Sequence, residues 1–367
     1  MRYWVALTQI PGIGPHRGQK ILQKIGHPQA LFDRGLRTAQ QLGLKPAQLE
    51  SMENIDWSAI EKYISWAEAP GKHLLTLDHP DYPEQLKRSY APLVLYVHGN
   101  LSLLTSPQVA MVGARNPTTA GRETAHDFAA NLANSGMTIT SGLADGIDGA
   151  SHKGALSVNG DTIAVMATGL DRVYPAHHRD LAWEIAEKGL IVSEYPPGTP
   201  VRKERFPQRN RLIAGLSLGT IVVEAALRSG SLITARHAVE FGREVFAIPG
   251  SIHNPLAKGC HMLIRQGAKL VEQANDIFEE LAPTLSYLIS EDQKPKELIH
   301  PQPVHELSAQ EAKIMEAMGY ETTSIELIVE RTHLPVEEIS STLLVLEMQG
   351  IVQAEPGGYR IIGGGAS

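Results

Sequence analysis

The chain of 367 residues has a single cysteine, Cys260, and its apolar residues do not gather into long runs. One cysteine excludes both a disulfide framework and a cysteine-rich metal cluster, and it suits a reducing compartment. No apolar stretch approaches the ~18 residues that a membrane-spanning helix needs. The apolar start of the chain is also too short for a signal peptide. We therefore expect a cytoplasmic protein with no membrane partner.

The chain also lacks the positive net charge that favours binding to nucleic acids. Its formal net charge is −7 and its pI is about 6.1, so the total argues against a nucleic-acid partner. The acidic residues are concentrated, however. Residues 305–363 hold ten Asp or Glu against three Lys or Arg, a net of −7, which leaves the first 304 residues close to neutral. Residues 201–211 hold five Lys or Arg and one Glu, a net of +4.

The middle of the chain alternates between apolar runs that predict strands and stretches that predict helices. Runs rich in Val and Ile, separated by helices of this length, predict a mostly parallel sheet covered on both faces, which is a Rossmann-like doubly wound α/β domain. Its functional loops should lie at the carboxyl ends of the strands. Strands are expected at 109–113, 137–140, 162–167, 190–193, 220–223 and 245–248, and helices at 120–135, 147–158, 179–187, 209–215, 231–241 and 260–266.

The two ends of the chain predict smaller helical modules. Near the N-terminus, the turn Pro11-Gly12-Ile13-Gly14 between helices is typical of a helix-hairpin-helix, which contacts either DNA or protein. Near the C-terminus, three helices followed by a hairpin predict a winged helix. The expected N-terminal helices are 15–25, 46–54 and 57–69, a connector follows from 71 to 92, and a strand is expected at 93–98. The expected C-terminal helices are 308–318, 324–332 and 335–349, with strands at 351–354 and 359–362.

These patterns divide the chain into four segments. We expect a helical domain resembling a sterile alpha motif or helix-hairpin-helix at 1–70 and a Rossmann-like domain at 71–289. Residues 290–304 are polar and contain prolines and lysines, so they predict a linker. A winged helix should occupy 305–363, and the last residues, 363–367, are expected to be disordered.

Several junctions between a strand and the next helix have residue types that suit an anion. Gly113-Ala114-Arg115 combines free backbone N–H groups with an arginine fork, and no GxGxxG dinucleotide fingerprint is present. Ser231 opens another helix, with Thr234 and Arg236 about one turn later. Lys258 stands at a third junction. Each junction alone could be a structural loop, but together they favour a phosphate-binding edge of the sheet.

The segment Ser141-Gly142-Leu143-Ala144-Asp145-Gly146-Ile147-Asp148 marks a further junction, and its glycines permit close backbone approach. Its acidic residues could act as general bases with His152 as a partner. The favoured interpretation is structural, with Asp145 or Asp148 capping the helix and His152 satisfied in the core.

The basic run Arg202–Arg211 predicts contact with a single DNA strand. Its cations can neutralise phosphates, and Phe206 offers a ring on which an unpaired base can stack. Pro207 precedes the expected helix, which would place Arg209 and its neighbours in the first turn, where cations oppose the helix dipole. A sequence that tolerates this cost favours an anionic ligand, and a solvated charged loop is the alternative.

Taken together, these segments resemble the bacterial DNA-processing protein A family, also called DprA or Smf. The patterns that carry the resemblance are VGAR, SGLADGIDGASH, GLDRVYP, FPQRNRLIAGL, VVEAALRSGSLITAR, PGSIHNP and KGCHMLIRQGA. The resemblance covers about residues 82–281. It implies a protein that binds and protects single-stranded DNA in natural transformation, helps to load the RecA recombinase, and forms a homodimer through the Rossmann-like domain.

The resemblance also assigns residues. It implies a DNA pocket that includes Arg115, Lys203, Phe206, Asn210 and Arg211. Further residues would line its margins, namely Ser141, Gly142, Ser231, Thr234, Arg236 and Lys258. Within the pocket we expect Lys203, Arg209 and Arg211 to contact phosphates, Phe206 to contact a base and Asn210 to position the strand. The helix at 260–266 is implied as a candidate dimer surface.

Two other functions remain open from the residues alone. Gly219-Thr220 and Glu224 resemble part of the PGGxGTxxE motif of nucleotide phosphoribohydrolases, although Leu216-Ser217-Leu218 replaces the Pro-Gly-Gly. Glu224 would then be a pocket carboxylate, and the alternative is a structural residue beside Arg228 or Arg236. The winged helix could instead bind duplex DNA as a regulator, but its acidity opposes this. No carboxylate cluster of metal-like spacing lies near the basic run, which opposes a nuclease. We expect no enzymatic activity, no metal and no cofactor.

Overall fold

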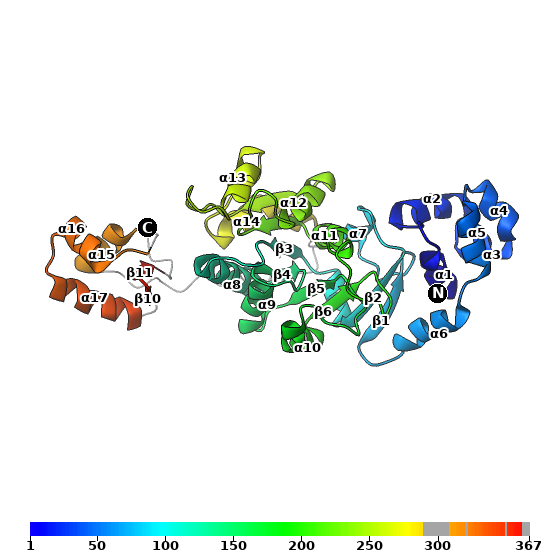
Figure 1. Cartoon of the computed structure of the whole chain (residues 1–367), viewed down its shortest axis with the longest axis horizontal. Coiled ribbons are helices and arrows are strands. Elements are labelled where there is room, and N and C mark those ends of the chain that lie inside the picture. Colours follow the sequence, from blue (N-terminus) through cyan, green and yellow to red (C-terminus); the bar gives the residue numbers. More distant parts are fainter. Residues whose placement is uncertain (289–307, 320–321, 349–350, 362–367) are drawn as a thin grey trace. The chain divides into compact units, whose positions relative to one another are not determined.

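The computed structural model describes residues 1–288, 308–319, 322–348 and 351–361. The chain forms two compact units, residues 1–294 and 295–367 (Figure 1). The expected linker at 290–304 and the expected disordered tail at 363–367 lie outside the described residues.

Short helices form the first part of the larger unit. They are α1 (Arg2–Gln9), α2 (Pro15–Ile25), α3 (Gln29–Asp33), α4 (Gly35–Gln41), α5 (Pro46–Glu53) and α6 (Trp57–Trp66). The predicted helices correspond to α2, α5 and α6, whereas α1, α3 and α4 were not predicted. Buried Trp4 and Leu7 of α1 pack in one apolar cluster with Leu74 and Tyr96 of the sheet. The helices therefore join the sheet edge through a shared core.

A nine-stranded sheet forms the centre of this unit, in the order β1-β2-β6-β5-β4-β3-β7-β8-β9. The strands from β3 onward are parallel, and β1 and β2 add an antiparallel edge. The strands are β1 (Lys72–Thr76), β2 (Val94–Gly99), β3 (Gln108–Val112), β4 (Thr138–Ser141), β5 (Thr162–Met166), β6 (Leu190–Ser193), β7 (Gly219–Val222), β8 (Glu244–Ala247) and β9 (Lys269–Leu270). The mostly parallel sheet is confirmed. The expected connector at 71–92 was wrong in part, because it contains β1 and α7 (Glu84–Lys87).

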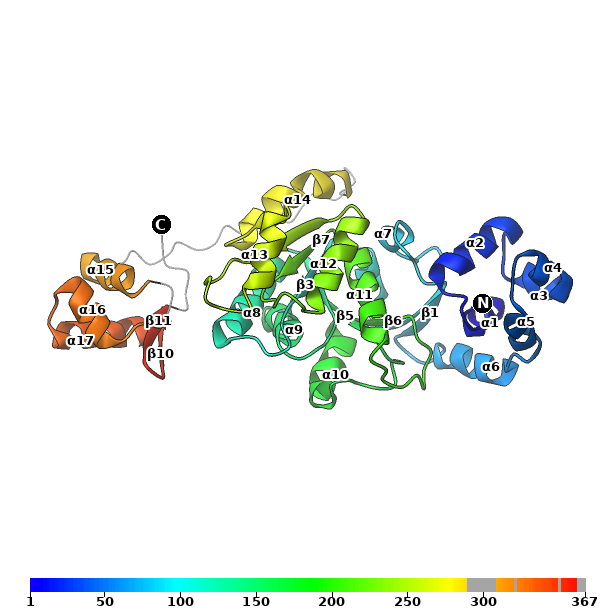
Figure 2. The ribbon, with the colours of Figure 1, turned by 45° about the horizontal axis from the view of Figure 1, so that its top comes forward.

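Helices cover both faces of the sheet. Successive side chains of a buried strand point to opposite faces, so each strand packs against helices on both sides. On β3, Ala110 and Val112 pack in the cluster that includes α11, α12 and α13, whereas Val109 and Met111 pack in the cluster of α8, α9 and α14. Figures 1 and 2 show α8 and α9 on one side of the sheet and α11–α13 on the other. The helices are α8 (Thr119–Asn134), α9 (Ile147–Ser157), α10 (Arg179–Lys188), α11 (Arg205–Leu216), α12 (Ser231–Glu240), α13 (Lys258–Arg265) and α14 (Ala274–Leu288).

The strand order reverses beside β3. From β3 the chain proceeds outward through β4, β5 and β6, and then returns to place β7, β8 and β9 on the other side. In doubly wound sheets, ligands bind outside the carboxyl ends of the strands at such a reversal. A ligand site is therefore expected at the junctions that follow β3, β4 and β7.

The smaller unit has the predicted order of three helices and a hairpin. They are α15 (Ala309–Met318), α16 (Ile325–Thr332), α17 (Val336–Met348), β10 (Val352–Glu355) and β11 (Gly358–Ile361). Ser308 caps α15 in a reciprocal pair with Glu311, and Ser324 caps α16. Buried Ile314, Ile328 and other apolar residues of the helices form its core. The winged helix is thus confirmed.

Candidate nucleic-acid interface

One cation and two aromatic rings meet at the carboxyl edge of the sheet, from three separate parts of the sequence. Arg115 follows β3, Tyr174 lies in the loop after β5, and Phe206 lies in the first turn of α11. The Arg115 guanidinium lies 5.4 Å from the centre of the Phe206 ring, and the Tyr174 and Phe206 ring centres are 5.5 Å apart. Arg115 and Tyr174 are exposed, and Phe206 is half-buried. This cluster, which we call the Arg115 cluster, offers positive charge and aromatic surface together.

A third aromatic residue, Tyr195, extends this surface along α11. The Arg205 guanidinium lies 4.8 Å from the Tyr195 ring centre. The Tyr195 hydroxyl donates a hydrogen bond to Gln208, at 3.1 Å. Burial raises the pKa of Tyr195, so the hydroxyl stays protonated at neutral pH. Neither Tyr174 nor Tyr195 was predicted as a site residue, because an isolated tyrosine in a loop carries no signal of which rings it will meet.

The start of α11 differs from the prediction. The helix begins at Arg205, so Arg209, Asn210 and Arg211 lie in the second turn and not in the first. The argument that these cations oppose the helix dipole at its first turn was therefore wrong for them. Pro207 caused the error: the sequence reading placed the start of the helix after it, although proline is tolerated within the first turn.

Arg209 points into the protein. Its side chain is 3% exposed, and its Nη1 atom donates to the carbonyl oxygens of Gly142 and Val165 at 2.5 and 2.6 Å. Burial lowers the pKa of Arg209 to about 10, which leaves it charged at neutral pH. These contacts tie α11 to the carboxyl ends of β4 and β5. A phosphate contact for Arg209 stays a prediction, but its guanidinium already has protein partners.

The remaining residues of the basic run divide into exposed and paired side chains. Lys203 is exposed beside the start of α11. Arg211 instead forms an ion pair with Glu194 and donates to the carbonyl oxygen of Tyr90. Asn210 donates to the carbonyl oxygen of Gly230 at 3.3 Å, which links α11 to the start of α12. Of these three, Lys203 is the residue whose charge is open to a ligand.

The junction after β4 is built by close backbone approach. The Gly142 N–H donates to the buried Asp148 carboxylate, as does the N–H of Ala144, at 3.2 and 3.3 Å. A Cβ at Gly142 would lie 2.0 Å from the Arg209 guanidinium, so a side chain there would displace Arg209 from its present position. Ser141 is buried and donates to the carbonyl oxygen of Met111. The backbone of this predicted anion site is thus occupied by protein groups. The role of Asp148 is structural, but the predicted helix cap was wrong, because no side chain in the described part of the chain caps α9 and Asp148 instead holds the preceding loop.

The junction after β3 also uses much of its backbone internally. Ala114 is buried, and its carbonyl oxygen accepts the first N–H of α9, from Ile147, at 3.1 Å. Gly113 leaves no room for a Cβ, which would lie 2.5 Å from the Ile147 side chain. Arg115 is therefore the part of this junction that faces outward.

The predicted margin residues lie on α12 and α13. Ser231 is buried and shares a hydrogen bond with Ser229, and Thr234 is buried. Arg236 and Lys258 are exposed. Within the residues that the structure describes, no hydrogen bond or ring contact joins Arg236 or Lys258 to the Arg115 cluster. The hydrogen bond from Asn210 to Gly230 adds a polar link between this region and α11, which also packs against α12 in the core.

Glu224 fills the position at which a Rossmann fold usually binds a nucleotide phosphate. Its carboxylate accepts the N–H and the hydroxyl of Thr118 at 2.9 and 2.8 Å, and the Asn254 amide at 3.2 Å. Thr118 in turn caps α8 beside the strand reversal. A Cβ at Gly121 would lie 2.5 Å from this carboxylate. The expected partners Arg228 and Arg236 were wrong, because the junction brings Thr118 and Asn254 to Glu224.

His152 is enclosed in the core. Its Nδ1 atom lies 2.7 Å from the Thr162 hydroxyl, which itself donates to the carbonyl oxygen of Ile139. The hydroxyl proton is therefore used, so His152 donates from Nδ1. Burial lowers the pKa of His152 to about 3, and the ring is neutral. A histidine that is 0% exposed in this way supports the structural interpretation.

These features define a class of protein: a Rossmann-like α/β domain with a cationic and aromatic edge, followed by a winged helix. Residues 73–282 match the family described as DNA recombination-mediator protein A, and residues 299–358 match the DprA winged helix domain. The chain belongs to the DNA recombination-mediator protein A family, the DprA and Smf proteins. The resemblance seen in the sequence is thereby confirmed.

Individual relatives agree. Protein Smf of Escherichia coli is 43% identical over 322 residues, which cover 87% of this chain and 85% of that protein. The crystal structure of DNA processing protein A from Streptococcus pneumoniae has a TM-score of 0.69 and 38% identity, covering 76% of this chain and 98% of that one. A structure of the Helicobacter pylori protein, described for its single-stranded DNA binding mode, has a TM-score of 0.52 and 32% identity, covering 57% and 96%.

One further property concerns membranes. None of the helices in the described part of the chain combines the length and the apolar character that crossing a membrane requires.

Proposed function

We propose that this protein binds single-stranded DNA across the carboxyl edge of its sheet, at Arg115, Lys203 and Phe206. The observation that carries the proposal is the Arg115 cluster, in which a guanidinium lies 5.4 Å from the Phe206 ring centre beside an exposed tyrosine. Arginine and lysine bind phosphate without reading bases, and an aromatic ring stacks on any unpaired base. The single-stranded DNA binding described for the Helicobacter pylori relative supports the same partner.

Single strands are preferred over duplexes for a physical reason. A base stacked on an aromatic ring contributes about 1–3 kcal/mol, and a duplex keeps its bases stacked on one another and presents no free face. Phosphate contacts release counterions, so binding should weaken with salt at a slope of about −0.7 per phosphate. Tyr174, which contacts Phe206, and Tyr195, which contacts Arg205, give the strand further aromatic surface.

The decisive experiment removes Arg115 and Lys203 together. We expect Arg115→Ala with Lys203→Ala to weaken single-strand binding at least tenfold and to reduce the salt slope by about 0.7 for each lost phosphate contact. Fluorescence anisotropy with a labelled oligonucleotide at two salt concentrations measures both quantities.

The matched control is Lys188→Ala with Lys269→Ala. Both lysines are exposed cations at the opposite, amino edge of the sheet, since Lys188 ends α10 and Lys269 starts β9. The control loses the same charge and should keep its affinity. Unchanged single-strand affinity in the Arg115 and Lys203 variant, or an equal loss in the control, would refute the interface.

Family membership supports a proposal for the wider role. We propose that the protein acts in the cytoplasm, in DNA processing during natural transformation, and that it has no enzymatic activity. In this proposal it loads RecA onto single strands and forms a homodimer through the Rossmann-like domain. Sedimentation tests the dimer, and RecA filament assembly on protected single strands tests loading.

We also retain the proposed domain limits 1–70, 71–289 and 305–363. No contact of Glu224 favours the phosphoribohydrolase alternative, since its carboxylate is held by Thr118 and Asn254.

A further inference from the structure

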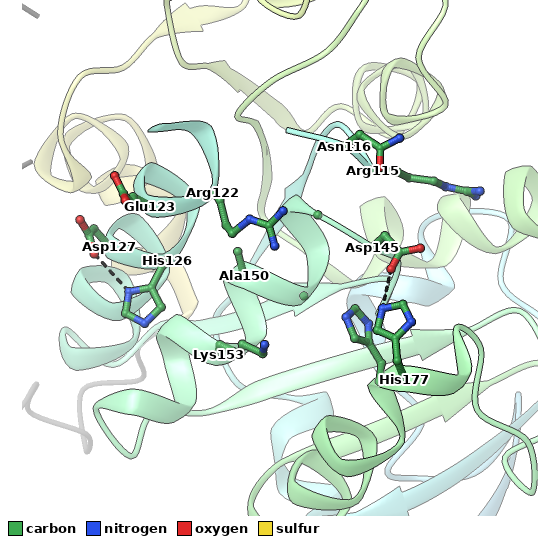
Figure 3. A pocket seen from close by; sticks show the side chains of 13 residues that line it. Arg115, Asn116, Arg122, Glu123, His126, Asp127, Asp145, Ala150, Lys153 and His177 are labelled. Atoms are coloured by element: carbon green, nitrogen blue, oxygen red, sulfur yellow. Dashed lines mark hydrogen bonds and ion pairs between the residues drawn. The ribbon is translucent and has the colours of Figure 1, made fainter. Parts of the chain in front are cut away.

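A cavity of about 500 Å³ lies beside α8 and α9, and Arg115 is among the residues that line it. Its walls come from the junctions after β3 and β4, from both helices and from the short turn η2 (Ala176–His178). Figure 3 shows Asp145 and His177 facing one another at one end of it, and His126 with Asp127 at the other. None of these acidic or histidine side chains takes part in the DNA interface proposed above.

Three potential metal ligands meet at the first of these ends. One ligand atom each from Asp145, His177 and His178 lies within 4.8 Å of the other two. The His177 Nε2 atom is 2.7 Å from the Asp145 carboxylate. Asp145 belongs to the junction after β4 and the histidines to η2, so two loops that are distant in sequence supply the set.

A hydrogen bond to the backbone fixes the orientation of the His178 ring. Its side chain is buried at 9% exposure, and its Nδ1 atom bonds to the carbonyl oxygen of Leu143 at 3.0 Å. A carbonyl oxygen only accepts, so Nδ1 carries the proton and Nε2 keeps its lone pair. Histidines that bind metals almost always donate their other N–H in this way. His178 is therefore held in the tautomer that a metal ligand requires.

The donor set indicates the kind of ion. Two imidazole nitrogens and one carboxylate suit divalent transition metals such as zinc, whereas magnesium and calcium prefer oxygen ligands. We propose that Asp145, His177 and His178 bind one divalent transition-metal ion, with a fourth position open to the cavity. The ion replaces the direct contact of Asp145 with His177, and both side chains are exposed enough to move apart, at 42% and 66%.

Such an ion would connect the junction after β4 to the loop that carries Tyr174. It would also add positive charge on the side of the cavity that Arg115 lines. The sequence did not predict this site, because adjacent histidines and a remote aspartate have no metal-like spacing. The proposal does not rest on DNA binding.

The test uses the full chain, stripped of metal with a chelator. We expect one Zn²⁺ per chain in competition with a chromophoric chelator at neutral pH, and binding at least tenfold weaker in His177→Ala and in Asp145→Asn. Co²⁺ should give visible absorption bands from nitrogen and oxygen ligands in the parent and lose them in both variants. Asp145→Asn keeps the size of the side chain, and His177 is exposed. Circular dichroism should therefore show that both variants are folded.

The matched control is His126→Ala. His126 is an exposed histidine that lies 3.1 Å from Asp127 and lines the same cavity, but among the residues that the structure describes it belongs to no group of three potential metal ligands. The proposal stands if His126→Ala binds Zn²⁺ as the parent does. It fails if the parent holds no Zn²⁺, if His177→Ala binds normally, or if His126→Ala loses as much affinity as His177→Ala.

Discussion

The ring of His152 is buried in the core, where a positive charge on it is strongly disfavoured. Its pKa in the folded protein is lowered to about 3 by burial, with His178 and Arg209 adding to the effect. An unfolded histidine has a pKa of about 6.5. Between these values the unfolded chain binds a proton that the folded chain does not, so the free energy of unfolding falls as the pH falls, by about 1.4 kcal/mol for each pH unit. Above pH 6.5 the contribution is constant.

This fall in the free energy of unfolding at lower pH gives a prediction for a single residue. His152→Gln removes the titrating group, so its stability should depend less on pH. From pH 7 to pH 5.5 the parent should lose about 1 kcal/mol more unfolding free energy than the variant. Urea unfolding at the two pH values measures the difference. The exposed His253 provides the control, because His253→Gln should follow the parent. Identical pH dependence of the His152 variant and the parent would show that His152 is protonated equally in both states.

At the scale of elements, α11 both presents the basic run and anchors the neighbouring strands. Arg209 reaches back to the ends of β4 and β5, where Asp148 is also buried. Burial raises the pKa of Asp148, and the nearby Arg209 charge opposes that rise. Removing one member of a buried charge pair leaves the other without compensation, which typically costs 3–5 kcal/mol, about half of the stability of many domains.

We therefore expect Arg209→Met to lower the free energy of unfolding by about 3–5 kcal/mol. Adding Asp148→Asn should restore part of the loss, since the amide oxygen can still accept the Gly142 N–H. Urea unfolding of the variants measures both effects. Lys203→Met is the control from the same basic run, and its exposed position should keep the change within about 0.5 kcal/mol. Normal stability together with weaker DNA binding in Arg209→Met would instead assign Arg209 to a phosphate.

On the scale of the whole molecule, the two units differ in charge. Residues 305–363 carry a net charge of −7, and the rest of the chain is close to neutral with its basic run at 201–211. A winged helix that binds duplex DNA needs positive charge, because phosphate repels an acidic surface. The winged-helix fold of the smaller unit favours a nucleic-acid partner, but the negative charge of the unit opposes one more strongly. We propose that it contacts protein or occupies the DNA-binding edge.

Truncation after residue 304 tests this assignment. We expect duplex affinity to stay within about twofold of the parent and single-strand affinity to stay equal or to rise, because an acidic module is removed. Anisotropy with single-stranded and duplex oligonucleotides at the same salt concentration gives both affinities. A sharp loss of duplex affinity would show that the winged helix itself binds DNA.

The parallel sheet, most of its helices and the winged helix could be predicted from the amino-acid sequence. Apolar runs such as Leu190–Ser193 are buried on both faces, so their composition alone indicates strands. The sequence did not reveal β1, because His73 and the prolines that follow hid a short edge strand, nor α1, which starts at the chain terminus without a capping side chain. Arg115, Lys203 and Phe206 were predicted from their residue types and from the family resemblance, and their contact with DNA stays a prediction.

Only the tertiary structure decided which charges and rings face outward. Arg209 and Arg211 lie in the same basic run as Lys203, yet one is buried on backbone carbonyls and the other is paired with Glu194. Tyr174 joins Phe206, and Asp145 joins His177, across loops far apart in the chain. The physical reason is that parallel strands bring their carboxyl ends to one edge, so that neighbours there are set by strand order and not by distance along the sequence.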